Sequence, residues 1–292
     1  MLNNHLLGLY EKALPVDMNW KSRLEAAKEL GFDFMEISID EKDERLERLY
    51  WSDEEKYAFL KIIKKSGIDI RSMCLSGHRR FPFGSSDPVA KEKAYEIMKL
   101  GIDFADYMGI KIIQLAGYDV YYEKSTEDSR KAFLEGLKWS CGYAARRNVM
   151  LAMEIMDTPF LNSITKNLWY EDKLHSSWYK VYPDLGNLTA WGNDVAEELI
   201  KGIDSIVAVH LKDTLAVTED FPGKFKCVPF GSGCVDFASA FEVLESKGYQ
   251  GHFMIEMWTD SRQDDIAEII KAKKFIEEKY EEGVSRIDNR IL

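Results

Sequence analysis

Short apolar runs alternate with longer stretches of helical periodicity along the chain. The runs are apolar at almost every position, as in Val149–Ile155, which is typical of parallel strands that are buried on both faces. Between the runs, apolar residues recur three or four positions apart, as at Leu24, Ala27 and Leu30. We therefore expect eight strands, at residues 6–10, 34–39, 68–75, 111–116, 149–155, 179–184, 206–212 and 253–258.

Several of the intervening stretches carry the marks of helix ends. Ser52 is an expected N-cap of a helix that ends at Gly67, and Gly109 ends another helix that starts near Val89. Further helices are expected at residues 126–147, 162–173, 195–202 and 237–247, with a last one around Ile266, Ile269 and Ile270. Eight strand–helix units in regular alternation predict an α/β fold, a single (β/α)8 TIM barrel spanning residues 1–292. A doubly wound open sheet is the alternative.

Four of the strand-like runs end in residues that bind metals. These residues are Glu154, Asp184, His210 and Glu256. Active sites of such barrels lie at the C-terminal ends of the strands, and a charged residue in an apolar strand is costly unless it is paired or metal-bound. We expect these four side chains to hold one divalent ion. A donor set of three oxygens and one nitrogen suits zinc, manganese, cobalt or magnesium and does not identify the metal. A structural ion network is the alternative.

Basic residues follow the third strand and the first. His78, Arg79 and Arg80 are consecutive, and Lys12 lies on the first loop. Such a set suffices for one phosphate group, although solvated surface charge explains it equally well. Lys212 lies two residues after His210, so strand alternation places both on one face and favours a substrate contact for Lys212.

Two further motifs have weaker interpretations. Gly231-Ser232-Gly233 resembles a phosphate cradle, but a tight turn is the better explanation of this pattern. Tyr121, Tyr122 and Trp258 suit a sugar pocket, and aromatic residues at a barrel rim are also ordinary packing.

Composition narrows the classes of function. The formal net charge of −11 argues against a nucleic-acid partner. No apolar run reaches 18 residues and no basic-then-apolar leader opens the chain, so no membrane association is expected. The four cysteines form no CxxC pair, which favours reduced thiols and a cytoplasmic protein.

The motifs in combination resemble the L-ribulose-5-phosphate 3-epimerase (L-xylulose-5-phosphate 3-epimerase) family of xylose-isomerase-like barrels. The segments that carry the resemblance are 9–15, 73–82, 114–122, 153–159, 182–188, 210–214 and 255–258. The resemblance implies a divalent metal held by Glu154, Asp184, His210 and Glu256. It also implies that Glu154 and Glu256 are the catalytic acid/base pair.

The implied reaction interconverts L-ribulose 5-phosphate and L-xylulose 5-phosphate, by proton removal and return at carbon 3 through a metal-stabilised enediolate. Related ketose 3-epimerases carry a His three residues after the metal-binding Asp, where this chain has Asn187; Asn187 is expected to contact the sugar phosphate. A homodimer is also implied. The alternatives are an epimerase or isomerase of a non-phosphorylated ketose, a metal-dependent endonuclease and a non-catalytic sugar-phosphate-binding barrel.

Overall fold

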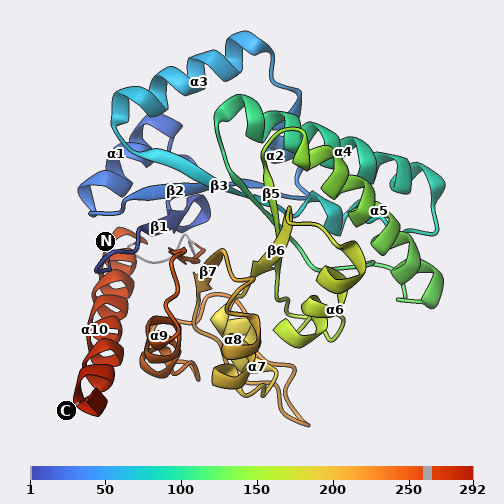
Figure 1. Ribbon diagram of the computed structural model, residues 1–292. Coiled ribbons are helices and arrows are strands. Elements are labelled where there is room, and N and C mark those ends of the chain that lie inside the picture. Colours follow the sequence, from blue (N-terminus) through green and yellow to red (C-terminus); the bar gives the residue numbers. More distant parts are fainter. Residues whose placement is uncertain (1, 259–264, 292) are drawn as a thin grey trace.

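Eight parallel strands form one sheet at the centre of the molecule, with helices outside it (Figure 1). The computed structural model describes residues 2–258 and 265–291. The strands are β1 (Leu7–Tyr10), β2 (Phe34–Ile39), β3 (Asp69–Leu75), β4 (Ile112–Leu115), β5 (Met150–Glu154), β6 (Tyr179–Tyr182), β7 (Ala208–Leu211) and β8 (His252–Ile255). Their order in the sheet is β6-β5-β4-β3-β2-β1-β8-β7.

Isolated bridges between β6 and β7 close the sheet into a barrel. Val181 pairs with Ile206, and Asp184 pairs with His210, both in parallel. The His210 N–H donates to the Pro183 carbonyl at 2.9 Å. The predicted (β/α)8 barrel is therefore confirmed, and the bridge that completes it lies at two of the predicted metal ligands.

The helices follow the strands in the expected alternation. They are α1 (Trp20–Glu29), α2 (Asp43–Leu46), α3 (Asp53–Ser66), α4 (Pro88–Met108), α5 (Glu127–Ala145), α6 (Ile164–Leu174), α7 (Leu185–Ala190), α8 (Val195–Gly202), α9 (Phe237–Ser246) and α10 (Asp265–Ile291). The described residues also form the 3₁₀ helices η1 (Glu11–Ala13), η2 (Glu47–Tyr50) and η3 (Gly77–Arg79).

The helix ends are fixed by local chemistry. Ser52 and Glu55 form a reciprocal capping box at the start of α3, and Gly67 ends that helix at a φ of 72°. Asp87 caps α4, and Pro88 occupies its first turn, where no backbone N–H is needed. These predicted boundaries are confirmed to within a residue or two.

Alternation along the strands separates the helix-facing core from the barrel interior. Met153, Val209 and Ile255 are fully buried in the main apolar core, whereas their polar neighbours Glu154, His210 and Glu256 point into the barrel. Of the helices in the described part of the chain, none has the length and apolarity needed to cross a bilayer.

Candidate metal centre

Glu154, Asp184, His210 and Glu256 converge at the C-terminal end of the barrel and are called the metal centre below. One ligand atom from each residue lies within 4.8 Å of the others, and all four side chains are buried. Glu154 ends β5, Asp184 follows β6, His210 lies in β7 and Glu256 follows β8. The sequence-based grouping of these four residues matches the geometry.

The two nitrogens of His210 face different partners. Nδ1 lies 3.2 Å from Glu154 Oε1, 3.7 Å from Glu256 Oε2 and 4.0 Å from Asp184 Oδ2. Nε2 points the other way and lies 3.1 Å from Glu36 Oε1. Nδ1 is therefore the nitrogen available to the metal centre.

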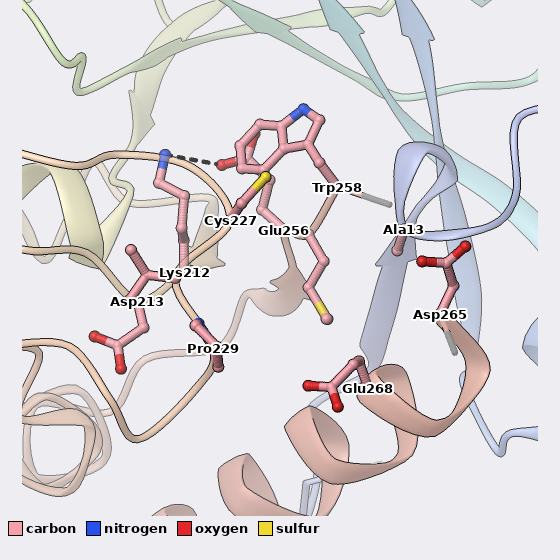
Figure 2. A pocket seen from close by; sticks show the side chains of 11 residues that line it. Ala13, Lys212, Asp213, Cys227, Pro229, Glu256, Trp258, Asp265 and Glu268 are labelled. Carbon is pink, nitrogen blue, oxygen red and sulfur yellow. Dashed lines mark ion pairs between the residues drawn. The ribbon is translucent and has the colours of Figure 1, made fainter. Parts of the chain in front are cut away.

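Two carboxylate oxygens of the metal centre face the Lys212 ammonium. They are Asp184 Oδ2 and Glu256 Oε2, both buried. The Lys212 ammonium lies 2.9 Å from the first and 3.1 Å from the second, and Figure 2 shows its ion pair with Glu256 beside the Trp258 ring. Three buried carboxylates and one imidazole suit a divalent cation.

Electrostatics in this cluster also favour a bound cation. Burial raises the pKa of Glu154, and the nearby Glu256 carboxylate adds to the rise. Burial raises the pKa of Asp184 to about 8. Burial would also raise the pKa of Glu256, but Lys212 and His210 outweigh it and lower that pKa to about 2. The raised values mean that the ionised forms of Glu154 and Asp184 are costly here unless further positive charge is present.

Glu154 and Asp184 are also fixed by neutral neighbours. The Gln114 amide, on β4, donates to Glu154 Oε2. Asp184 Oδ1 caps α7 by accepting from the Asn187 N–H at 2.6 Å. The sequence interpretation missed α7 because the six residues after Asp184 include a Gly and an Asn, which have low helix propensity.

A narrow cavity of about 40 Å³ opens next to the metal centre. Asn187 lines it, donating through Nδ2 to the Ile155 carbonyl at 2.8 Å and leaving Oδ1 without a partner among the described residues. Lys212 and Trp258 also line it. The structure thus brings two predicted substrate contacts, Asn187 and Lys212, to the metal centre.

An outer pocket of about 400 Å³ continues from this cavity and is called the cationic pocket. Lys12, Arg79, Lys226 and Trp258 line both the cavity and the cationic pocket. The Lys12 ammonium pairs with Asp40 at 2.6 Å, and Arg79 pairs more loosely with Glu41 at 3.6 Å. The Arg79 guanidinium also lies over the Tyr121 ring at 4.7 Å, and its Nε has no hydrogen-bond partner among the described residues. Lys226 and Lys212 each lie 5.4 Å from the Trp258 ring centroid.

The sequence interpretation missed Lys226, which lies in the long loop between β7 and α9. Burial lowers the pKa of Lys226, and the Arg79 and Lys212 charges lower it further. An irregular loop has no periodic pattern that fixes the direction of its side chains. The sequence therefore does not predict that Lys226 lies near Arg79.

The structure does not bring His78, a predicted phosphate contact, to the cavity or to the cationic pocket. Its side chain is 6% exposed, stacks on Phe83 at 5.1 Å and contacts the Ala94 carbonyl through Nε2 at 3.0 Å. Burial lowers the pKa of His78 to about 4, so the ring is neutral. Arg80 points to solvent, where it pairs with Asp43 at 2.6 Å, and it lines neither the cavity nor the cationic pocket.

The geometry of η3 explains these three directions. A 3₁₀ helix has three residues per turn, so consecutive side chains point to different sides. His78 therefore enters the core, Arg79 reaches the pocket and Arg80 faces water.

The Gly231-Ser232-Gly233 segment is a turn that binds a carboxylate of its own chain. The N–H groups of Gly231 and Gly233 both donate to Asp213 Oδ2 at 2.9 Å. Because Asp213 fills this position, the turn interpretation is confirmed and the segment is not a phosphate site.

Comparison with known proteins agrees with the site. A family model described as Xylose isomerase-like TIM barrel matches residues 24–284. SgbU of Escherichia coli K12 is 53% identical over 282 residues, which cover 97% of this chain and 99% of SgbU. The L-ribulose-5-phosphate 3-epimerase UlaE of Shigella sonnei is 52% identical over 270 residues, which cover 92% of this chain and 93% of UlaE.

The chain belongs to the L-ribulose-5-phosphate 3-epimerase family of xylose isomerase-like TIM barrels. The family resemblance inferred from the motifs is confirmed. A solved structure of an L-ribulose 3-epimerase superimposes with a TM-score of 0.76 at 19% identity, covering 97% of each chain. At 19% identity this similarity shows a shared fold, which covers nearly the whole length of both chains.

Proposed function

We propose that this chain is an isomerase that interconverts L-ribulose 5-phosphate and L-xylulose 5-phosphate by epimerisation at carbon 3. The observation that carries the proposal is the buried convergence of Glu154, Asp184, His210 and Glu256 next to a pocket whose lining includes Lys12, Arg79 and Lys226. Relatives that are about half identical over nearly the full chain and are named for this activity support it.

The metal centre would hold one divalent ion through Glu154, Asp184, His210 Nδ1 and Glu256. Bound there, such an ion supplies Lewis-acid polarisation of a ketone oxygen. The burial of all four side chains and the closeness of their ligand atoms support this assignment. Zinc, manganese, cobalt and magnesium all accept this donor set.

Glu154 and Glu256 perform the proton transfers in this proposal. They end β5 and follow β8, so they approach the cavity from different sides of the barrel, and both line it. Inversion at carbon 3 needs one carboxylate to remove the proton from one face and a second to return a proton to the other. The bond from Gln114 leaves the other oxygen of Glu154, Oε1, facing the metal centre.

Lys212 is suited to stabilise charge on the substrate. Its ammonium is buried between Asp184 and Glu256, and burial, which would lower its pKa, is outweighed by those carboxylates, which raise it. Lys212 therefore stays protonated and would donate to the oxygen that becomes negative when the proton leaves carbon 3. Asn187 Oδ1 would accept from a substrate hydroxyl.

The cationic pocket would bind the phosphate. Lys12, Arg79 and Lys226 line it together, and charge-assisted bonds to phosphate are strong. Arg80 and His78 are left out of this proposal because neither lines the pocket. The pocket favours a phosphorylated substrate over a free ketose.

A coupled assay tests the proposal directly. The purified protein would be analysed for bound metal and then assayed on L-ribulose 5-phosphate and on L-ribulose, before and after a chelator. We expect conversion of the phosphorylated sugar, loss on chelation and recovery on metal addition. Equal conversion of the free sugar would favour a ketose epimerase instead, and no conversion of either sugar would refute the proposal.

We also propose a single domain over residues 1–292 and a homodimer in the cytoplasm. One sheet contains all eight strands of the described chain, which supports the single domain. The family resemblance supports the dimer, and light scattering would measure it. Buried free thiols at Cys74 and Cys141 suit a reducing compartment.

A further inference from the structure

Glu36 is a fully buried carboxylate that the catalytic scheme does not use. It lies on β2, with no exposed side-chain surface, and faces the barrel interior. Its Oε1 lies 3.1 Å from Nε2 of His210, which is 174 residues away in sequence and also fully buried. The register of β2 against β3 shifts between Met35 and Glu36, and such irregularities re-aim side chains near active sites.

The second oxygen of Glu36 is also occupied. The Tyr182 hydroxyl donates to Oε2 at 3.2 Å, and the Tyr182 ring lies 4.4 Å from the His210 ring. Tyr182 ends β6, directly before the Pro183-Asp184 segment. Glu36 is thus held between the side chains of β6 and β7, below the metal centre.

A second buried carboxylate shows what ordinary charge compensation looks like in this barrel. Glu11 is equally buried, and it pairs with Arg48 at 2.7 Å and with Arg45 at 3.2 Å. Among the described residues, the only ion pair of Glu36 is with His210. A structural role alone does not explain a buried carboxylate whose one cationic partner is an imidazole.

The arrangement of the imidazole supplies the explanation. A neutral histidine carries a proton on one nitrogen and a lone pair on the other, and the partner of the protonated nitrogen decides which is which. Nδ1 faces the three carboxylates of the metal centre, and Nε2 faces Glu36. Because a carboxylate only accepts, Glu36 requires the proton on Nε2. Glu154 is placed to accept a second proton from Nδ1 when no cation is bound, and a cation that displaces that proton finds the lone pair on Nδ1 while Glu36 keeps the proton on Nε2.

We propose that Glu36 is a positioning residue for metal ligation: it accepts the Nε2 proton of His210, and so directs the Nδ1 lone pair at the metal centre. Tyr182 holds Glu36 in that orientation. The proposal rests on the proposed function, since it concerns the same metal centre. Such outer partners orient metal-binding histidines and increase their basicity as ligands.

The first test is the affinity for Mn²⁺, measured by competition with a chelator on the full chain. Glu36→Gln should bind Mn²⁺ about 10–100-fold more weakly than the unaltered protein. Tyr182→Phe should show a smaller loss, about threefold, because only one hydrogen bond to Glu36 is removed. Glu11→Gln is the matched control, a buried carboxylate that does not contact His210, and its Mn²⁺ affinity should be unchanged.

The second test uses the unaltered protein, so it can be carried out even if the Glu36→Gln variant does not fold. Nitrogen NMR of the Zn²⁺-loaded, histidine-labelled protein distinguishes protonated from metal-bound ring nitrogens. We expect His210 to carry its proton on Nε2 and the metal on Nδ1. The reverse assignment would overturn the proposal, as would an unchanged Mn²⁺ affinity in Glu36→Gln. If the unaltered protein bound neither Mn²⁺ nor Zn²⁺, the proposed function itself would fail.

Discussion

The candidate metal ligands come from β5 to β8, whereas the cations that line both the cavity and the cationic pocket come from segments after β1, β3 and β7. In the first region each ligand lies in a strand or directly after one, so alternation fixes its direction. In the second, Lys12 and Arg79 lie on 3₁₀ turns and Lys226 on an irregular loop. In the proposed function, the chemistry that needs fixed geometry therefore depends on the strands, and phosphate binding depends on the loops.

The largest effect should come from the strand-borne glutamates. Glu154→Gln and Glu256→Gln each remove a proton-transfer group that also belongs to the metal centre. We expect kcat for epimerisation to fall by at least about 10³-fold in either variant. Assays that are quenched at set times, followed by separation of the two sugar phosphates, measure this rate. Substantial activity in either variant would contradict the two-base mechanism.

Metal removal should affect the strand region and leave the loop region folded. Chelation should abolish activity and lower stability by about 2.7 kcal/mol relative to protein with metal at 100 times its Kd. Thermal unfolding with and without chelator measures the shift. An identical melting temperature in both conditions would argue against a metal bound to Glu154, Asp184, His210 and Glu256.

Removing cations from the loops should weaken substrate binding more than turnover. In the double variant Arg79→Ala/Lys226→Ala, KM for L-ribulose 5-phosphate should rise about 10–100-fold, because charge-assisted bonds to the phosphate are lost. Arg80→Ala is the matched control, and its KM should change less than twofold because Arg80 is 46% exposed and lines neither pocket. An equal rise in KM in the double variant and in Arg80→Ala would contradict the proposal that the cationic pocket binds the phosphate.

Replacing His78 tests whether this residue is structural, in contrast to its neighbour Arg79, which lines the cationic pocket. His78→Ala should cost about 2–3 kcal/mol of unfolding free energy, because it leaves a cavity beside Phe83 and removes the buried hydrogen bond to the Ala94 carbonyl. Urea unfolding measures the loss. A raised KM in the folded variant would return His78 to the substrate site.

The smallest effect is expected at the opposite end of the barrel, where side chains serve stability rather than catalysis. His5 is buried, with Nε2 2.8 Å from Glu245 and Nδ1 2.6 Å from the Gly251 carbonyl. Burial would lower the pKa of His5, but the bonds to Glu245 and Gly251 outweigh it and raise the pKa above 6.5.

Because the folded pKa of His5 is raised, its contribution to stability is complete below pH 6.5 and is lost as the pH rises through the folded value. We expect His5→Gln to reduce the unfolding free energy by about 1 kcal/mol at pH 5.5 and by less at pH 9. Urea titrations at both pH values measure it. A loss that is larger at pH 9 would contradict the assignment.

The sequence specified the barrel and the metal centre because both depend on periodic patterns. Glu154, His210 and Glu256 lie in or next to apolar strands, where the direction of a side chain follows from its neighbours. Asp184 was found for the same reason, although the short helix that it caps was missed. The sequence does not identify Glu36 as the partner of His210, because two other strands, β1 and β8, lie between β2 and β7 in the sheet.

The loop residues could not be placed in the same way. His78, Arg79 and Arg80 are consecutive and equally basic in the sequence, but a single 3₁₀ turn sends them to the core, the pocket and solvent. Lys226 reaches the pocket through a loop whose path depends on tertiary contacts such as the Asp213 bonds to Gly231 and Gly233.

The most direct measurement of the central claim is solvent deuterium uptake at carbon 3 of L-ribulose 5-phosphate. In heavy water, the metal-loaded protein should incorporate one deuterium at that carbon as L-xylulose 5-phosphate forms, because the proton removed by one glutamate is replaced by another from the second. Chelated protein should incorporate none. Epimerisation without deuterium at carbon 3, or uptake that is unaffected by the chelator, would contradict the account.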